Sequence, residues 1–383
     1  SLSDQGIHRF GSRARRAPRS RCRPSALPSI SPHAHPTSAS FLDMIEHRTL
    51  GRTGLKISEL CLGTLNFGWK TDEASSFAIL DAFRAAGGNF LQGAAIAPTF
   101  TLPSASTNVT EEIIGRWRTS RSIPRGDLVL GTRLSVRPEP GARTNLAELV
   151  CQRTLESMRR LNTDYLDLLV IEWNDALLPA SQLLEAFDAA VRQCFVRYIG
   201  VSNFPSWRVV DLIGRAFRRN QSRMEVLQAE YSLMTRARYE PEKMSLCEEQ
   251  LLGFIAMSPL ARGFLAQSSH APDRFIDLRR RFARRFDNAY GDAARSAVEN
   301  VASRHGASAA QVALAWVLHN PTVSSAMIGV RSPQELKELA VACSLRLSPD
   351  DMVELSDATT AEEIIVPGAR SQAPAFASEV LAN

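Results

Sequence analysis

From Met44 onward, the chain alternates short apolar runs with longer amphipathic segments. The apolar runs are rich in Leu, Ile and Val and lack strict alternation, which is typical of strands covered on both faces. Eight runs have strand length: Leu60–Thr64, Asn89–Leu91, Leu128–Thr132, Tyr165–Ile171, Ile199–Val201, Val226–Ala229, Phe254–Met257 and Ala326–Val330. Amphipathic segments between them predict helices over Thr71–Ala86, Ala147–Leu161, Ala180–Phe195, Ser206–Phe217 and Ser308–His319.

This order of strands and helices predicts an α/β fold, a parallel (β/α)8 TIM barrel. A doubly wound open sheet is the alternative, and it is less favoured because no GxGxxG motif follows any of the runs. Ahead of the barrel, His47–Ser58 predicts a short β-hairpin that could plug the lower mouth of the barrel. We therefore expect one barrel domain over residues 44–383.

The first 43 residues differ in composition from the rest of the chain. They hold seven arginines against Asp4 and Asp43, which accounts for the whole net charge of +5. Because the remainder is balanced in charge, we expect no nucleic-acid partner. The Arg-, Ser- and Pro-rich composition predicts a disordered tail. It fits a transit peptide, sequence foreign to the native protein ahead of a start at Met44, or a regulatory arm, and we favour the second.

The apolar stretches and the cysteines bear on location. No stretch approaches the roughly 18 apolar residues of a membrane span, so we expect no membrane partner. The six cysteines are scattered and form none of the close pairs typical of zinc or redox sites. We expect reduced thiols, no bound metal, and a cytoplasmic protein, or an organellar one if the tail is a transit peptide.

Six sequence blocks resemble the aldo-keto reductase family and occur in that family's order. They are HRTLGRTGLKISELCLGTLNFG from His47, TEEIIGRW from Thr110, TDYLDLLVIEWND from Thr163, RYIGVSNF from Arg197, LQAEYSLM from Leu227 and GVRSPQEL from Gly329. The resemblance covers Ile45 to Asp357. It implies the barrel, a small-molecule substrate, and an NADP(H) site at the carboxyl ends of the strands.

The resemblance also implies which residues hold the nucleotide. The matched positions are Gly63, Thr64, Ser202, Asn203, Gln228, Tyr231, Ser258, Leu260, Gly263, Leu265, Arg331, Ser332 and Glu335. Ser202, Asn203 and Gln228 would bond the nicotinamide carboxamide, and Tyr231 would stack on its ring. The loop from Ser258 to Leu265 would wrap the pyrophosphate.

Arg331 and Ser332 match the positions that hold the 2′-phosphate, a role that suits the planar fork of arginine. Nearby, Glu335 replaces the usual Gln and Leu339 the usual Asn, so we expect weakened phosphate binding. Ordinary structural roles also fit some of these residues: Asn203 as a helix cap, Tyr231 as a core residue and Arg331 as a surface residue.

The proton-transfer residues that the resemblance implies, an Asp, a Tyr, a Lys and a His, are all replaced. Matching the strands places Gln92 at the Asp, Ala97 at the Tyr, Arg133 at the Lys and Glu172 at the His. A methyl group cannot protonate an oxyanion, and a guanidinium is a poor proton shuttle. Glu172 alone adds an acid, although it could equally form an ion pair with Arg133 across adjacent strands.

Three functions follow from this combination. The first is an NADP(H)-dependent oxidoreductase with an altered site, in which Glu172 acts as acid and ordinary carbonyl reduction is impaired. The second is a non-catalytic NADP(H)-binding protein, a pseudoenzyme. The third is a lyase, isomerase or cyclase that uses the pair Arg133 and Glu172 without redox chemistry.

Overall fold

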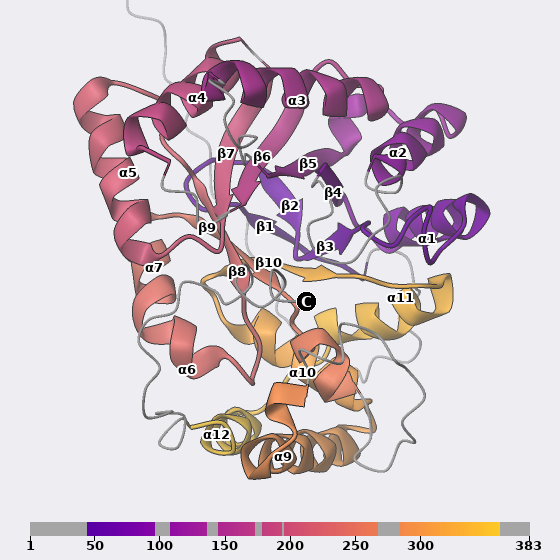
Figure 1. Ribbon diagram of the computed structural model, residues 1–383. Helices are drawn as coiled ribbons and strands as arrows, with labels where there is room; N and C mark the ends of the chain where they lie inside the picture. Colours follow the sequence, from indigo (N-terminus) through magenta and orange to yellow (C-terminus); the bar gives the residue numbers. More distant parts are fainter. Residues whose placement is uncertain are drawn as a thin grey trace, which may run out of the picture. The chain divides into compact units, whose positions relative to one another are not determined.

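The computed structural model describes residues 44–95, 108–135, 145–172, 178–193, 195–266 and 284–360. Eight parallel strands form a closed barrel in the order β10-β3-β4-β5-β6-β7-β8-β9 (Figure 1). Their bounds are β3 Leu60–Gly63, β4 Phe90–Ala95, β5 Val129–Leu134, β6 Leu166–Glu172, β7 Val196–Ser202, β8 Val226–Glu230, β9 Gly253–Met257 and β10 Val323–Ile328. The predicted (β/α)8 barrel is confirmed, and each predicted apolar run lies on one of these strands. The open-sheet alternative is wrong.

Helices pack around the outside of the barrel, where a large apolar cluster joins them to the strands (Figure 1). Those that the amphipathic segments predicted are α1 (Glu73–Ala85), α3 (Leu146–Arg160), α4 (Ala180–Arg192), α5 (Ser206–Arg219) and α10 (Ala309–His319). The structure adds α2 (Val109–Ser120), α6 (Arg236–Tyr239), α7 (Ser245–Gln250), α9 (Ala289–His305), α11 (Pro333–Ala340) and α12 (Pro349–Asp357). None of the described helices is long and apolar enough to cross a membrane.

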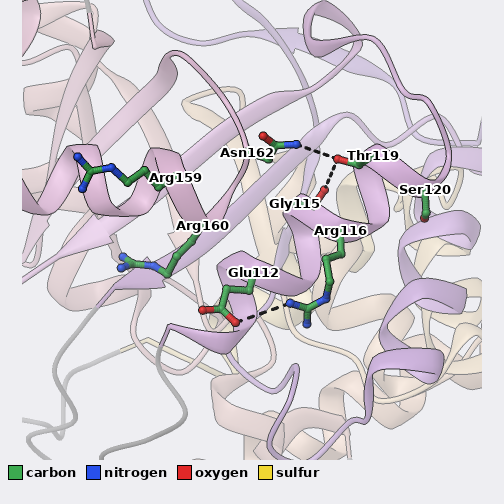
Figure 2. Close-up of a pocket in the computed structure, with 8 residues that line it drawn as sticks. All are labelled: Glu112, Gly115, Arg116, Thr119, Ser120, Arg159, Arg160 and Asn162. Carbon is green, nitrogen blue, oxygen red and sulfur yellow. Dashed lines mark hydrogen bonds and ion pairs between the residues drawn. The ribbon is translucent and has the colours of Figure 1, made fainter.

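A shallow groove of about 650 Å³ lies on the outside of the barrel, between α2 and the end of α3 (Figure 2). Its lining includes Arg116 and Arg160, but both guanidinium groups are already paired. Arg116 bonds Glu73, and Arg160 lies 2.7 Å from the buried carboxylate of Glu111. Two of the three arginines that line the groove are therefore neutralised, and the groove does not lie where the strands end.

The predicted hairpin is present and closes the amino-terminal end of the barrel. Strands β1 (His47–Thr49) and β2 (Lys56–Ser58) pair antiparallel. Leu50 and Ile57 are fully buried in the same apolar cluster as the inward side chains of the barrel strands. The turn packs so closely that a Cβ added to Gly51 would lie 2.3 Å from the backbone nitrogen of Gly253.

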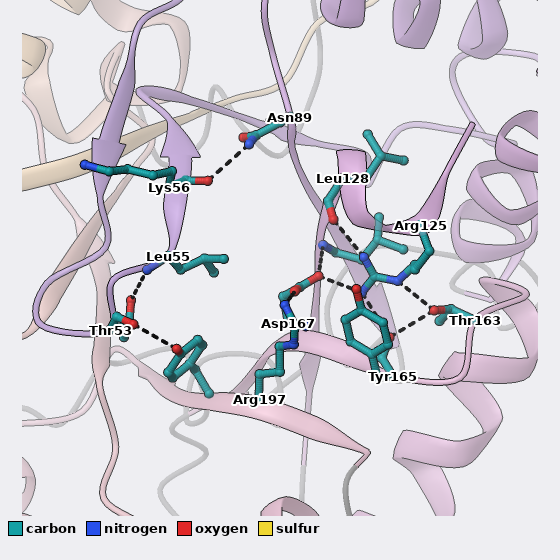
Figure 3. A network of polar contacts seen from close by, with 12 residues as sticks. Thr53, Leu55, Lys56, Asn89, Arg125, Leu128, Thr163, Tyr165, Asp167 and Arg197 are labelled. Atoms are coloured by element: carbon teal, nitrogen blue, oxygen red, sulfur yellow. Dashed lines mark hydrogen bonds and ion pairs between the residues drawn. The ribbon is translucent and has the colours of Figure 1, made fainter.

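A polar network lies at this same amino-terminal end (Figure 3). The buried carboxylate of Asp167 lies 2.6 Å from Arg125 and 3.2 Å from Arg197. Both guanidinium groups also pack on the ring of Tyr165, at 3.8 and 4.6 Å from its centroid. These contacts join β6 and β7 to the turn before β5, so we interpret them as stabilising the barrel rather than as chemistry.

Candidate active site

The period of a β-strand determines which side chains meet at the carboxyl end of this barrel. Alternate residues of a strand face the same side. On β6, Leu168 and Val170 belong to the inner cluster, so Glu172 also faces inward. The same phase on the other strands turns five further side chains to the interior near the strand ends. They are Gln92 on β4, Arg133 on β5, Ser202 on β7, Gln228 on β8 and Met257 on β9.

Arg133 and Glu172 form an ion pair at the strand ends. The Arg133 Nε and Glu172 Oε2 atoms are 3.0 Å apart, and the two side chains are 19% and 21% exposed. Arg133 Nη1 also lies 3.3 Å from the sulfur of Met257, and Asn203 Nδ2 donates weakly to Glu172 Oε1 at 3.4 Å. Glu172 is thus an acceptor within a small polar cluster, as the ion-pair interpretation predicted.

The side-chain amides of Gln92 and Gln228 hydrogen-bond to each other across the interior of the barrel. Gln92 Nε2 donates to Gln228 Oε1 at 3.2 Å, and Gln228 Nε2 donates back to Gln92 Oε1 at 2.9 Å. Both side chains are buried. A primary amide has two N–H groups and two lone pairs, so each keeps one N–H and one lone pair for further hydrogen bonds. A ligand at Gln228 would therefore meet an amide already held in position by Gln92.

Two buried oxygens of this site lack a hydrogen-bond partner among the described residues, Glu172 Oε2, which has only its ion-pair contact with Arg133, and Ser202 Oγ. The Ser202 side chain is fully buried. Leaving a buried hydroxyl unpaired costs about 1–3 kcal/mol. Ser202 pairs in register with Glu172 on one side and Gln228 on the other. The unpaired Ser202 oxygen therefore lies between the two polar pairs of the site.

Asn203 follows Ser202 in a left-handed conformation, with φ of 59°. Its backbone N–H donates to the carbonyl of Gln228 at 2.9 Å, which ties the turn to β8. Asn203 does not cap the next helix, because α5 begins after Pro205 and has no side-chain cap. The helix-cap explanation for Asn203 is therefore wrong.

Tyr231 lies in the apolar core. It is fully buried, its ring packs against Trp316 with centroids 5.5 Å apart, and its hydroxyl bonds Glu240 and Asn320. Burial, followed by the nearby Glu240 carboxylate, raises the pKa of Tyr231 above its usual range. The prediction that this ring stacks on a nicotinamide gains no support from the geometry, and the packing alternative describes its surroundings.

Among the described residues, no tyrosine forms a hydrogen bond with Arg133 or Glu172. All five tyrosines lie in the described residues. The hydroxyls of Tyr198, Tyr231 and Tyr290 bond groups away from the ion pair, and Tyr165 lies at the amino-terminal end. Tyr239 is on α6, where burial raises its pKa and makes it a weaker acid. Ala97 lies outside the described residues.

The remaining strand-end positions are arranged as follows. Gly63 ends β3 beside Gln92. The hydroxyl of Thr64 is buried, 2.7 Å from the Thr110 hydroxyl and 3.2 Å from the carbonyl of Gln92. Thr64 is therefore already used to join β3 to β4 and α2, which leaves mainly its backbone to face a ligand.

The loop after β9 has an unusual backbone. Ser258, Ala261 and Arg262 all have positive φ, and Gly263 follows with φ of 97°. Leu260 is half-buried and Leu265 is buried, so the loop is attached to the core at both ends. A Cβ added to Gly263 would meet nothing within 4 Å, so the strand-end loop has open space at this point. Strained left-handed runs of this kind are typical of ligand-binding loops.

The segment after β10 joins Arg331, Ser332 and Glu335. Ser332 caps α11, and its hydroxyl accepts the backbone N–H of Glu335 at 3.1 Å. Glu335 Oε2 accepts the backbone N–H of Arg331 at 2.8 Å and lies 3.5 Å from Arg331 Nε. Leu339, by contrast, is buried in the core.

Two side chains near the mouth were not predicted. Met257 contacts Arg133, and its place at the end of the seventh apolar run could have identified it. Lys243 is buried and donates to the carbonyl of Phe204 at 2.9 Å, next to Asn203. Burial lowers the pKa of Lys243. Lys243 lies in an irregular π-helical turn, Glu240–Met244, which the sequence pattern does not predict.

Comparison with known proteins places this site in context. The model of the Aldo/keto reductase family matches residues 59–359. Over 345 residues the chain is 32% identical to the uncharacterized oxidoreductase YrpG of Bacillus subtilis (strain 168), covering 86% of this chain and 98% of that protein. It is 28% identical to Protein tas of Escherichia coli (strain K12), with 81% and 96% covered. It is also 28% identical to norsolorinic acid reductase A of Aspergillus parasiticus, with 82% and 80% covered.

Proposed function

Because this chain belongs to the aldo/keto reductase family, we propose that it binds a nicotinamide dinucleotide at the carboxyl ends of its barrel strands. We further propose that it is an oxidoreductase in which ordinary carbonyl reduction is impaired. The observation that carries the first part is the buried, unpartnered hydroxyl of Ser202. The observation that carries the second is the ion pair of Arg133 and Glu172.

The described residues fit a nicotinamide nucleotide. Ser202 supplies a hydroxyl that lacks a partner, Gln228 keeps one N–H and one lone pair, and the strand-end loop has open space at Gly263. These groups would hold the carboxamide and the pyrophosphate. NADP(H) is the form that the family resemblance implies, with Arg331 and Ser332 at the 2′-phosphate. When bound, a reduced nicotinamide supplies a hydride to an electrophilic carbon.

The chain's own residues do little to move the matching proton. Arg133 can donate hydrogen bonds to a developing oxyanion, which is electrostatic stabilisation rather than proton transfer. Glu172 already accepts a hydrogen bond from Asn203 and lies in an ion pair with Arg133, so an acid role would require that cluster to open. General acid–base assistance is worth about 10²–10⁴ in rate, and we expect a loss of that order relative to a site with an intact donor.

The pseudoenzyme alternative uses the same nucleotide site and predicts no turnover at all. The hydrogen bonds between Gln92 and Gln228 and the ion pair between Arg133 and Glu172 favour this alternative. In both pairs the side chains already contact each other rather than an open position for a substrate. The same engagement weighs against a lyase, isomerase or cyclase built on Arg133 and Glu172, which needs an uncommitted acid or base.

Calorimetric titration with NADPH and NADH tests the nucleotide site. We expect the native chain to bind at least one of them, and Ser202→Ala to bind about tenfold more weakly because a buried ligand hydrogen bond is lost. Ser325→Ala is the matched control: Ser325 is a buried serine on β10 whose hydroxyl already bonds the carbonyl of Ser58. It should bind the nucleotide like the native chain. Absence of binding by the native protein would refute the proposal.

Turnover separates the oxidoreductase from the pseudoenzyme. With reactive aldehydes such as 4-nitrobenzaldehyde, we expect slow, saturable oxidation of the bound nucleotide. Glu172→Gln should abolish that activity if Glu172 delivers the proton, whereas full retention would remove Glu172 from the mechanism. Binding without any oxidation, over the whole panel of aldehydes and ketones, would establish the pseudoenzyme instead.

A further inference from the structure

The segment that would hold the 2′ end of the nucleotide already contains an anion. Glu335 is the third residue of α11, and its Oε2 accepts the backbone N–H of Arg331 at 2.8 Å. The same oxygen lies 3.5 Å from the guanidinium Nε of Arg331. One carboxylate oxygen therefore engages both the backbone and the side-chain donors of Arg331, the residue proposed to bind the 2′-phosphate.

We propose that Glu335 makes this site select NAD(H) over NADP(H), an inference that rests on the nucleotide site proposed above. A 2′-phosphate would have to displace the carboxylate from Arg331 or lie beside it, and like charges at such distances repel. A 2′-hydroxyl has neither problem, because it can donate a hydrogen bond to the carboxylate. In Rossmann folds an acidic side chain bonds the ribose 2′-hydroxyl of NAD and an arginine accommodates the 2′-phosphate of NADP, and the same chemistry applies to Glu335 and Arg331.

Ser332 and Leu339 add no positive charge for a phosphate. The hydroxyl of Ser332 accepts the backbone N–H of Glu335 as the cap of α11 and keeps its O–H to donate to either form of the nucleotide. Leu339, one turn further along α11, is buried and has no polar group to offer the nucleotide. The pair Arg331 and Glu335 is 62% and 33% exposed, so a nucleotide can reach both side chains.

The helix itself does not supply the missing positive charge. The amino terminus of a helix favours a nearby anion, and at α11 the Glu335 carboxylate already fills that role. A nucleotide phosphate arriving here meets a site whose arginine is neutralised. Replacing Glu335 by Gln keeps the shape of the side chain and removes the charge, so that Arg331 is released to bind phosphate bidentately.

Calorimetry with NADH and NADPH on the full chain tests the inference. We expect the native protein to bind NADH at least about tenfold more tightly than NADPH, and Glu335→Gln to remove or reverse that preference by raising NADPH affinity at least about tenfold. Glu338→Gln is the matched control, since Glu338 is exposed on the same helix and its side chain accepts a hydrogen bond only from Gln334 among the described residues. Its NADH-to-NADPH ratio should equal that of the native chain.

Competition of adenosine 2′,5′-bisphosphate and of AMP with bound NADH tests whether the change in selectivity arises at the adenosine end of the nucleotide. Glu335→Gln should raise the affinity for the bisphosphate relative to AMP, and Glu338→Gln should leave that ratio as in the native chain. Tighter binding of NADPH than NADH by the native chain would overturn the selectivity while leaving the nucleotide site in place. An unchanged ratio in Glu335→Gln would overturn the role of Glu335. Failure of both nucleotides to bind any variant would overturn the nucleotide site itself.

Discussion

At the mouth of the barrel, the side chains at the family's catalytic and cofactor-binding positions contact one another. In the family pattern, the residues at these positions would act on a substrate or hold the nucleotide. Gln92 pairs with Gln228, and Arg133 pairs with Glu172. The charged residues at the family's catalytic positions, Arg133 and Glu172, therefore neutralise each other. An unpaired charge at a partly buried position would destabilise the fold. Ser202 is the contrast, because its buried hydroxyl lacks a partner in the described structure. These residues support the proposal that the site binds a ligand and lacks an ordinary proton donor.

The ion pair predicts non-additive stability effects. Arg133→Met and Glu172→Gln should each lower the free energy of unfolding by about 1 kcal/mol, because the pair is only partly exposed and each change leaves the other residue without its opposite charge. The double variant should lose less than the sum, with a coupling of at least about 0.5 kcal/mol. Urea denaturation of the four proteins gives the values. Strictly additive losses would show that the pair contributes no interaction.

Ser202 predicts the opposite behaviour from an ordinary buried serine. Ser202→Ala should leave the free energy of unfolding of the nucleotide-free protein unchanged or raise it, because no described hydrogen bond is lost. Ser325→Ala should lower it by about 1 kcal/mol, because the bond to Ser58 is lost. Thermal melts of both variants check this. A clear loss in Ser202→Ala would mean that the hydroxyl has a partner within the protein.

Among the secondary-structure elements, the hairpin has a turn that packs directly against the backbone of the barrel. Gly51 and Gly54 both have positive φ, but only Gly51 approaches the backbone around Gly253. Gly54→Ala should cost about 1 kcal/mol for its backbone conformation alone. Gly51→Ala should cost clearly more, since its methyl group would also displace the hairpin. Equal losses in chemical denaturation would show that the hairpin does not plug the barrel.

Helices α9 and α12 are joined by a pH-sensitive contact. Burial acts to raise the pKa of Asp351, but hydrogen bonds from Arg304, His305 and Ser348 outweigh it and lower the pKa well below the usual range. A carboxyl group with a lowered pKa in the folded state stabilises the protein above its unfolded pKa of about 3.9, and this contribution is lost as the pH falls below that value.

Asp351→Asn should therefore be less stable than the native chain at pH 7, with a difference that shrinks as the pH is lowered from about 5 toward 2. Unfolding free energies across this range, from urea titrations, provide the measurement. A difference independent of pH would mean that the Asp351 carboxylate is not the group whose charge stabilises the contact.

For the molecule as a whole, sequence reasoning recovered the architecture better than the site. The strands were predictable because parallel strands covered on both faces need apolar runs, and the hairpin because its glycines mark a turn. Their ends were less predictable: β10 begins at Val323, ahead of the apolar run, because Ser324 and Ser325 are polar yet buried. Helix α2 was not predicted at all.

The pairings within the site depend on contacts between distant parts of the chain. Gln92 and Gln228 are 136 positions apart, and no local pattern links them. Tyr231 was assigned to the nucleotide because its neighbours in sequence match the family, but Trp316 and Asn320 of the α10 region surround it in the fold. By contrast, the pairing of Arg133 with Glu172 could be anticipated because both end adjacent strands.

We propose that the nucleotide site of this barrel remains while the means of protonating a reduced oxygen is gone. Stopped-flow fluorescence of the protein saturated with reduced nucleotide and mixed with 4-nitrobenzaldehyde tests both parts of this proposal. We predict a bound-nucleotide signal that decays at least about 100-fold more slowly than the 10 s⁻¹ typical of enzymes. Decay at about 10 s⁻¹, or no bound-nucleotide signal at all, would contradict the claim.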